Sequence, residues 1–245
     1  MPAKGVHVPR GHAISVEGAR LALGGDPPLD VLGGVHLVAH AGQVTAVIGP
    51  SGCGKSTLLD AIAGLQPLDA GQVDTGGDVA LMPQRDALMP WLTLGDNVAM
   101  GARVAGVASA EARRLAAGAI RRLGLEGFAD HYPHALSGGM RQRGALARTL
   151  IAGRSTWLLD EPFGALDALT RAGMHDVLRD LHAAESPTIL LVTHDISEAV
   201  GLAHRVLVSG PGPMRIVDDI TVDPADPAVA AGRALDALRS AGALA

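Results

Sequence analysis

The sequence predicts an α/β fold with a largely parallel sheet. Strand-like apolar runs alternate with helical patterns along most of the chain, which is the order that crossover connections between parallel strands produce. The chain has 245 residues, of which 48% are hydrophobic. This composition is sufficient for the core of one α/β domain, or of a domain that carries a subdomain.

The first third of the chain contains the first strands and a short helix. Residues 12–23 and 35–49 favour strands, and the second run passes through a turn at residues 41–42. Residues 54–64 favour a helix that a glycine ends. Residues 79–83 (VALMP) are again strand-like. Apolar strands therefore flank a helix that begins in a glycine-rich turn.

The middle of the chain, about residues 86–152, is predicted to be mostly helical. Its clearest helical pattern begins at Ser109, which we expect to act as the N-terminal capping residue, and ends at Gly124. Because strand-like runs occur on both sides of this segment, it is predicted to be a helical lobe inserted into the α/β core.

The last third returns to alternation. Strand-like runs occur at residues 155–160, 188–193 and 205–209, with helical patterns at residues 168–185 and 196–203 between them. Residues 223–245 predict a turn-rich link and one amphipathic helix. No further domain is expected in this tail.

Charge and composition exclude several classes of protein. The net charge is -5, and the positive charge comes from eighteen scattered arginines and two lysines, so the basic patch of a nucleic-acid-binding protein is missing. The single cysteine, Cys53, excludes an internal disulfide framework and a cysteine-based zinc site, which fits a reducing cytoplasm.

Neither a signal peptide nor a membrane-spanning helix is predicted. Residues 1–13 contain two prolines and no apolar core of signal-peptide length, so we expect a frayed lead-in. Residues 31–54 carry no charge, but they include six glycines, a proline and two histidines, which is atypical of a spanning helix.

A phosphate-binding loop is predicted between the strand at residues 44–48 and the following helix. Gly49, Gly54, Lys55 and Ser56 match the pattern G-x-x-x-x-G-K-[ST]. Glycines let backbone N–H groups converge on a phosphate chain, and the helix adds its positive end. The predicted nucleotide-binding residues are Gly49, Pro50, Ser51, Gly52, Cys53, Gly54, Lys55, Ser56 and Thr57.

Two residues of this loop have specific predicted roles. Lysine is a compact charge on a flexible stem, so Lys55 can reach between two phosphates where an arginine fork would need a wider loop. Ser56 is predicted to hold a magnesium ion. The alternative is a glycine-rich turn with an incidental lysine, in a chain with 32 glycines among 245 residues.

An acidic pair at the end of a buried strand is the second element of the predicted site. Residues 157–159 are apolar and lead directly to Asp160 and Glu161. Asp160 is predicted to lie near the magnesium ion, while Glu161 is placed to orient or deprotonate the water that attacks the γ-phosphate. Taken alone, such a pair is more often a helix-capping turn.

The stretch LSGGMRQR, residues 136–143, resembles the signature LSGGQ of the ATPase subunits of ABC transporters, with Met140 in the glutamine position. Ser137, Gly138 and Gly139 open a helix and so form a second anion-binding N-terminus. The resemblance implies a head-to-tail homodimer in which each ATP lies between one subunit's phosphate loop and the other's signature. A helix cap is the alternative.

The resemblance also implies the fold, and it covers residues 13–220. The whole chain, residues 1–245, would form one nucleotide-binding domain with the P-loop NTPase core of ABC ATPase type. The core with an antiparallel β subdomain would comprise residues 13–85 and 153–222, with a helical subdomain at 86–152 and a tail helix at 223–245.

Further family residues occur in the expected order. Gln84 matches the glutamine that senses magnesium and the γ-phosphate, Asp167 in GALD matches the loop that crosses the dimer, and His194 matches the switch histidine. Taken alone, each would more often be structural or solvated. The family usually stacks adenine on an aromatic residue, but Leu23 stands at that position in this chain.

Residues 83–101, together with the stretches around Asp160 and His194, resemble the ATPase subunits of nitrate, sulfonate and taurine importers. This resemblance implies ATP and Mg²⁺ as cofactors, integral-membrane permease subunits and a solute-binding protein as partners, and a place at the cytoplasmic face of the membrane. Trp91 would either contact the permease or fill the core of the helical lobe.

Two other classes of protein also contain a phosphate loop. A soluble ABC ATPase that acts on nucleic acid or ribosomes usually carries two ATPase modules or a long coiled-coil insertion, and neither occurs here. A metabolic kinase with a phosphate loop would not need the signature or His194. The sequence therefore favours a transporter ATPase.

The thiol of Cys53 lies in the phosphate loop near a helix N-terminus, which favours a thiolate. We therefore expect maleimide to inactivate the protein and bound ATP to protect it. The alternative is a buried, inert thiol.

Overall fold

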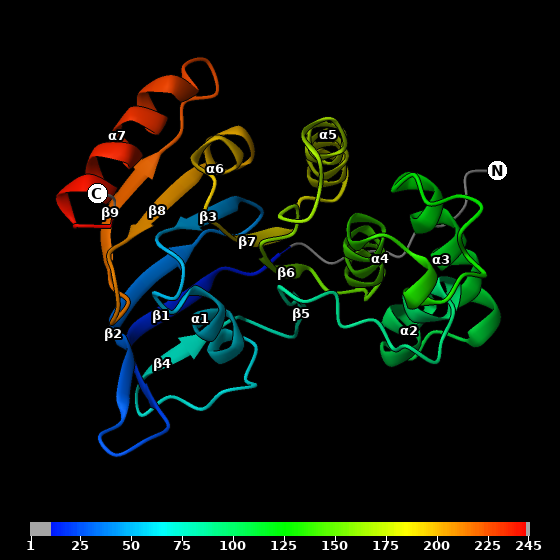
Figure 1. Ribbon diagram of the computed structural model, residues 1–245, viewed down its shortest axis with the longest axis horizontal. Helices are drawn as coiled ribbons and strands as arrows, with labels where there is room; N and C mark the ends of the chain where they lie inside the picture. Colours follow the sequence, from blue (N-terminus) through cyan, green and yellow to red (C-terminus); the bar gives the residue numbers. More distant parts are fainter. Residues whose placement is uncertain (1–10, 244–245) are drawn as a thin grey trace.

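The computed structural model describes residues 11–243, so the prediction for residues 1–13 lies largely outside the described part. The described chain forms two sheets and a lobe of helices (Figure 1). The α/β fold with parallel and antiparallel sheets is confirmed.

The larger sheet has six strands in the order β5-β6-β7-β3-β8-β9. The strands are β3 (Val44–Ile48), β5 (Val79–Met82), β6 (Thr156–Asp160), β7 (Thr188–Thr193), β8 (Arg205–Ser209) and β9 (Ile216–Thr221). All neighbours pair in parallel except β8 and β9. The sequence did not predict β9, whose pattern is polar.

The smaller sheet is antiparallel, with the order β2-β1-β4. Its strands are β1 (Ile14–Leu23), β2 (Leu29–Ala39) and β4 (Ala70–Asp74), and β4 was not predicted. The predicted turn after β2 is present, since the Gln43 N–H donates to the His40 carbonyl. This turn leads from the smaller sheet into β3 at the centre of the larger one.

The helices cover the larger sheet and build the lobe. They are α1 (Lys55–Ile62), α2 (Leu94–Val104), α3 (Ser109–Arg122), α4 (Gly138–Leu150), α5 (Ala168–Glu185), α6 (Ile196–Leu202) and α7 (Pro227–Ser240), with a short 3-10 turn at Pro133–Ala135. In Figure 1, α2 and α3 stand at the end of the molecule opposite β2, and α7 lies beside β8 and β9.

The predicted cap of α3 is wrong. The N-cap position is Ala108, and no side chain accepts a hydrogen bond there. Ser109 is already the first helical residue. The helix therefore begins one residue too early for the serine hydroxyl to cap it, and Glu111 supplies the negative charge of the first turn.

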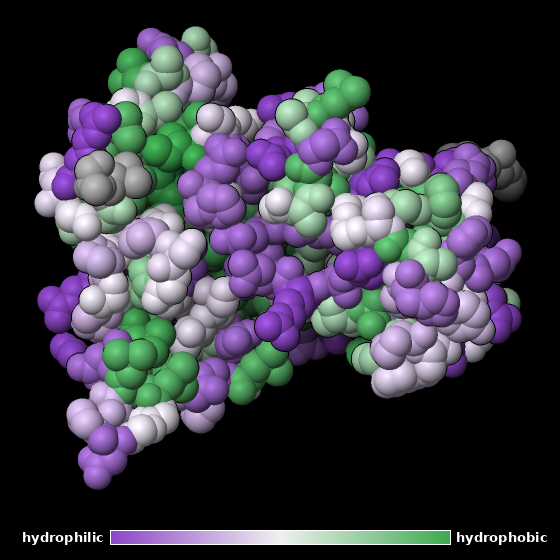
Figure 2. Space-filling model, in the orientation of Figure 1, coloured by the Kyte–Doolittle hydropathy of each residue, from purple (hydrophilic) through white to green (hydrophobic). Residues whose placement is uncertain are grey.

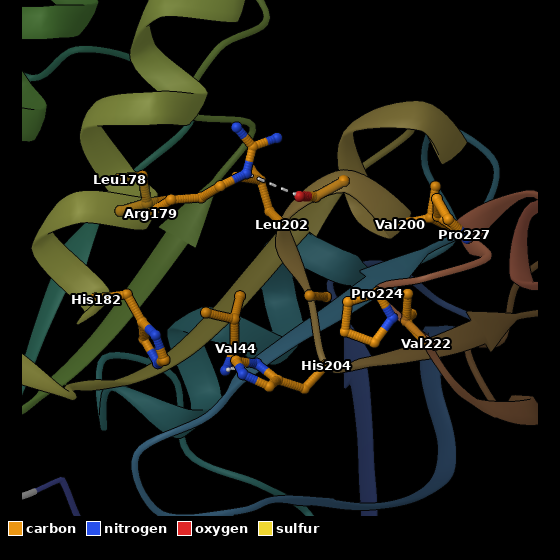
Figure 3. Close-up of a pocket in the computed structure, with 12 residues that line it drawn as sticks. Val44, Leu178, Arg179, His182, Val200, Leu202, His204, Val222, Pro224 and Pro227 are labelled. Carbon is orange, nitrogen blue, oxygen red and sulfur yellow. Dashed lines mark hydrogen bonds between the residues drawn. The ribbon is translucent and has the colours of Figure 1, made fainter.

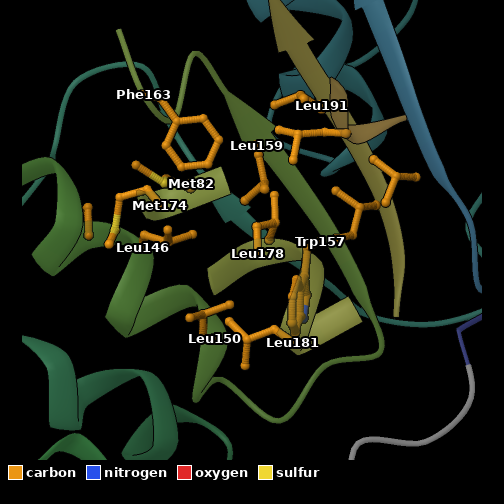
Figure 4. Close-up of a cluster of buried hydrophobic side chains, with 14 of the residues drawn as sticks. Met82, Leu146, Leu150, Trp157, Leu159, Phe163, Met174, Leu178, Leu181 and Leu191 are labelled. Carbon is orange, nitrogen blue, oxygen red and sulfur yellow. The ribbon is translucent and has the colours of Figure 1, made fainter. Parts of the chain in front are cut away.

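One part of the core lies between the larger sheet and the helices α4 and α5 (Figure 4). A second part lies between the larger sheet, the smaller sheet and α1. Trp157 on β6 and Phe163 just beyond it are fully buried. Every residue of β6 and β7 is buried, because helices or the smaller sheet cover both faces of the larger sheet. The carboxyl ends of these rigid strands carry the candidate site.

The surface is mixed. On the face shown in Figure 2, apolar side chains form separate patches among polar ones, one of them over the region of β2 and β4. Within residues 11–243, no helix is long and apolar enough to cross a membrane.

Candidate functional site

The phosphate loop connects the end of β3 to the first turn of α1. Gly52 and Gly54 have φ angles of 77° and 116°, a backbone conformation that other residues rarely adopt. A Cβ atom on Gly54 would also lie 2.9 Å from the carbonyl oxygen of Val31. The glycines therefore allow the loop to curl against the start of β2.

The side chain of Lys55 points back into this loop. Its Nζ donates hydrogen bonds of 2.8 Å to the carbonyl oxygens of Gly49 and Pro50. Only 6% of Lys55 is exposed, and a buried cation requires such partners. The loop thus holds its positive charge at its own centre, where the phosphates of a nucleotide would meet it.

A cavity of about 250 Å³ opens on this loop. It is lined by Val31, Ser51, Gly52, Gly54, Lys55, Ser56, Thr57, Gln84 and Glu161. The fold therefore brings together four segments that are separate in the sequence: the start of β2, the phosphate loop, the segment after β5 and the segment after β6.

Glu161 lies at the meeting point of the predicted catalytic residues. Its Oε2 accepts a hydrogen bond of 3.1 Å from Gln84 Nε2, and its Oε1 lies 3.1 Å from His194 Nδ1. The backbone of Glu161 is strained, with a φ of 46°, and its N–H donates to the Val192 carbonyl. This geometry fixes the carboxylate at the rim of the cavity.

Asp160 is the last residue of β6 and is 4% exposed. Burial raises the pKa of its carboxyl group, while a hydrogen bond with Ser56 acts in the opposite direction. Its Oδ1 has no hydrogen-bond partner among residues 11–243. An oxygen that is buried without a partner next to Ser56 suits a hard cation such as Mg²⁺.

No cluster of three or more His, Cys, Asp or Glu side chains suited to a metal occurs in the described part of the chain. Mg²⁺ does not need one, because it is commonly held by one or two protein groups together with phosphate oxygens and waters. The pair Ser56 and Asp160, with Gln84 at the cavity, therefore fits a nucleotide-bound magnesium ion.

The signature residues lie elsewhere. Ser137 caps α4, accepting a hydrogen bond from the Met140 N–H at 3.2 Å. Ser137, Gly138 and Asp167 are exposed, and neither they nor Gly139 line the phosphate-loop cavity. Within one chain, the two anion-binding helix N-termini are therefore not combined into one site.

Gln142 is a residue of this region that the sequence did not single out. It is 6% exposed, and its Nε2 donates to the Glu161 carbonyl at 2.6 Å while its Oε1 accepts from the Ala165 N–H at 2.8 Å. Gln142 thereby joins the signature helix α4 to the loop that carries Glu161. Its two partners lie 19 and 23 residues further along the chain, so no local pattern in the sequence indicated this role.

Leu23 does not line the cavity. It ends β1, is 39% exposed and pairs with Leu29, which is 70% exposed. Leu23 therefore does not belong to the core of the smaller sheet. Leu23, the last residue of β1, and Leu29, the first residue of β2, thus form an exposed apolar pair. Val31, which lines the cavity, lies two residues further along β2.

The thiol of Cys53 is buried, which is the alternative that the sequence left open. The thiol is 2% exposed and lies 3.4 Å from Ser209 Oγ, on the inner side of the phosphate loop. Cys53 is not among the residues that line the phosphate-loop cavity. We now expect maleimide to modify native Cys53 slowly, and at full rate only after denaturation. Rapid, ATP-sensitive labelling of the folded protein would contradict this placement.

A second cavity, of about 510 Å³, lies between α5, α6 and the start of α7 (Figure 3). Its two histidines are engaged by the backbone: His182 Nε2 lies 2.9 Å from the Gly42 carbonyl, and His204 Nδ1 accepts a hydrogen bond from the Val44 N–H. None of the predicted site residues lines this cavity.

Comparisons with known proteins find similar sequences over most of the chain. The family model described as "ABC transporter" matches residues 32–164. The chain is 44% identical over 199 residues to the taurine import ATP-binding protein of Chromobacterium violaceum, covering 78% of this chain and 75% of the relative. It is 46% identical over 193 residues to an aliphatic sulfonates import ATP-binding protein of Pseudomonas syringae pv. syringae, covering 78% and 79%.

Solved structures with a similar fold were also found. One is a dimeric ATP-binding cassette in a post-hydrolysis state with bound ADP and phosphate, with a TM-score of 0.79 and 27% identity. Another is a dimeric bacterial ABC transporter cassette, with a TM-score of 0.78 and 28% identity. Each alignment covers 86% of this chain and 99% of the other.

Proposed function

Because this chain belongs to the ABC transporter family and is an ATP-binding ATPase of that family, we propose that it powers a separate membrane permease that imports a small organic sulfonate. The observation that carries the catalytic part is the meeting of Gln84, Glu161 and His194 at the rim of the phosphate-loop cavity. We further propose that residues 86–152 act as the helical subdomain and that residues 13–85 and 153–222 form the core.

Each side chain then has a distinct role in hydrolysis. The backbone N–H groups of residues 51–57 cradle the phosphates, and Lys55 exchanges its loop carbonyls for phosphate oxygens. Glu161 accepts a proton from the attacking water, while Gln84 and His194 hold its carboxylate in place. Ser56 and Asp160 would hold a magnesium ion, which would neutralise negative charge on the phosphates.

The proposed dimer is head-to-tail. Ser137 of the signature and Asp167 are exposed and do not line the chain's own cavity, so a second copy is free to reach them. The dimeric state of the two similar cassettes supports this arrangement. Each ATP would lie between the phosphate loop of one copy and residues 137–139 of the other.

The proposed solute class rests on the similar proteins, whose names specify import of taurine and aliphatic sulfonates. We propose that the permease receives its solute from a solute-binding protein and that this chain acts at the cytoplasmic face of the membrane. Nitrate, which the sequence also suggested, is the competing small anion.

A groove beside the helical lobe is suited to the permease. It has a volume of about 470 Å³ and lies between β5, α2 and α4. Leu65 and Val104, which line it, are 67% and 76% exposed. An amphipathic cytoplasmic helix of the permease would cover this apolar groove.

Trp91 is 70% exposed, so the placement of Trp91 in the core of the lobe is wrong.

Reconstitution tests the proposed function. The chain and the permease subunits encoded by neighbouring genes are placed in liposomes, and ATP-dependent uptake of taurine, an alkanesulfonate and nitrate is measured with the matching binding protein. Uptake of taurine or the sulfonate that requires ATP is expected. Uptake of nitrate alone would overturn the solute class, and failure to form a complex would overturn the permease partner.

Val104→Arg is expected to weaken permease binding at least tenfold while leaving ATP hydrolysis by the isolated chain unchanged. Arginine would place a charge on apolar surface that the permease covers, at a cost of about 1.4 kcal/mol or more. Co-purification with the permease measures the effect. Val229→Arg is the matched control, because Val229 is also exposed, at 63%, but lies on α7; equal loss in both variants would contradict the groove.

Leu23→Tyr is expected to tighten ATP binding if residue 23 faces the adenine. Leucine forfeits ring stacking, which contributes roughly 0.5–1.5 kcal/mol, so GTP is expected to compete with ATP within about tenfold in the native protein. Titration with a fluorescent ATP analogue and a thermal melt measure both effects. Unchanged affinity in a well-folded variant would show that residue 23 does not contact the base.

A further inference from the structure

We propose that Arg171 is a positioning residue that ties the loop crossing the dimer to the loop carrying His194. The two loops are residues 164–167 and residues 193–195, hereafter the crossing loop and the switch loop. No motif assigns a role to Arg171, and the inference rests on the proposed head-to-tail ATPase.

The guanidinium of Arg171 contacts both loops. Its Nη2 donates to the Leu166 carbonyl at 3.0 Å, and its Nη1 lies 3.4 Å from Asp195 Oδ2. The Arg171 and Asp195 side chains are each 32% exposed, so the ion pair is partly shielded from water. One side chain on the first turn of α5 thus bridges segments that are 29 residues apart in the sequence, Leu166 and Asp195.

Asp195 belongs to the switch loop and makes further hydrogen bonds that hold this loop in place. Its Oδ1 accepts hydrogen bonds from the Ser197 and Glu198 N–H groups and so caps α6. Its own N–H donates to Thr193 Oγ1. The residues on both sides of His194 are therefore fixed, which determines where its ring meets Glu161 Oε1.

At the other end, Leu166 belongs to a packed part of the crossing loop. A Cβ atom on Gly139 would lie 2.9 Å from Leu166 Cδ2, so Leu166 packs directly against the signature. The next residue, Asp167, is exposed and caps α5 through Thr170. A second copy that contacts Asp167 would therefore contact the crossing loop. Arg171 connects this loop to the switch loop, which carries His194.

The shape of the guanidinium explains why an arginine is needed. Its planar fork presents several N–H donors in fixed directions, so it satisfies a carbonyl and a carboxylate at the same time. A lysine ammonium is a single point charge and would favour Asp195 over Leu166. Methionine would fill part of the volume but provide neither contact.

Arg171→Met is expected to lower kcat about tenfold and change KM for ATP less than twofold, because misplacing His194 and Glu161 affects the reaction rather than phosphate binding. Arg171→Lys is expected to recover part of the lost kcat. Affinity for a fluorescent ATP analogue and the melting temperature are measured for each variant, so that loss of fold is recognised.

Arg179→Met is the matched control. Arg179 lies on the same helix and also contacts an acid and a backbone carbonyl, since Nη1 lies 2.6 Å from Asp176 Oδ1 and Nε donates to the Gly201 carbonyl at 3.2 Å (Figure 3). It touches neither the crossing loop nor the switch loop. This variant is expected to hydrolyse ATP at the wild-type rate.

Asp195→Asn completes the test, since the amide oxygen can still cap α6 while the charge is lost. If Arg171 acts through Asp195, the double variant is expected to lose no more kcat than Arg171→Met alone. If the fold-reductions in kcat of Arg171→Met and Asp195→Asn multiply in the double variant, the proposed link between Arg171 and the switch loop is overturned. Equal reductions in kcat in Arg171→Met and Arg179→Met would overturn it as well. An active wild type with an unaffected Arg171→Met overturns only this inference, whereas an inactive wild type overturns the proposed ATPase and the inference together.

Discussion

Glu161→Gln is expected to lower the rate of ATP hydrolysis by about a hundredfold or more while ATP binding is retained. Glutamine keeps the size of the side chain and its hydrogen bonds to Gln84 and His194, but it cannot accept a proton from the attacking water. General-base catalysis contributes about 10²–10⁴-fold to the rate. Lys55 and the phosphate loop, which hold the nucleotide, are unchanged.

Because hydrolysis would stop before the nucleotide is released, ATP-bound dimers of Glu161→Gln are expected to accumulate. Light scattering with ATP and magnesium measures the dimer, and phosphate release measures the rate. Glu126→Gln is the control, since the Glu126 side chain is 73% exposed and its Oε1 lies 3.4 Å from Nε of the exposed Arg121. A Glu161→Gln protein that stays monomeric and turns over normally would remove Glu161 from the mechanism.

Gln142→Leu is expected to produce the second-largest loss. The substitution would leave the Glu161 carbonyl and the Ala165 N–H without the partners that Gln142 now provides. An unsatisfied buried polar group costs about 1–3 kcal/mol. We therefore expect a lower melting temperature and a kcat reduced at least tenfold, because the loop that carries the general base is no longer held against α4.

The same two measurements, a thermal melt and steady-state hydrolysis, separate these effects. Gln72→Leu is the control, because Gln72 is exposed on β4 and its side chain donates to the exposed Glu17. If Gln142→Leu melts and hydrolyses ATP as the wild type does, the contact between the signature helix and the Glu161 loop is not functionally important.

Local patterns predicted most of the α/β core. The strands β7 and β8 and the helix α5 match the expected ranges, because each is a run of one periodicity bounded by residues that break it. The strands β4 and β9 were missed. Their sequences, AGQVD and IVDDIT, are rich in polar residues and largely exposed, so only pairing with β1 and β8 makes them strands.

The site divides in the same way. The phosphate loop, Asp160 and Glu161 could be located from short patterns, since the functional residues of each pattern are adjacent in the sequence. Gln142 and Arg171 could not, because their partners Glu161 and Asp195 lie 19 and 24 residues further along the chain. The role of such side chains depends on tertiary contacts, which residue spacing does not encode.

The exposure of Ser137 and Asp167, away from the chain's own cavity, has a kinetic consequence. If two copies must meet before either site is complete, the initial rate in dilute solution follows second-order dependence on protein concentration, and doubling the protein raises activity per molecule. Two copies held on one permease face each other at an effective concentration in the millimolar range. Membrane assembly would then make the activity per molecule independent of how much protein the cell contains.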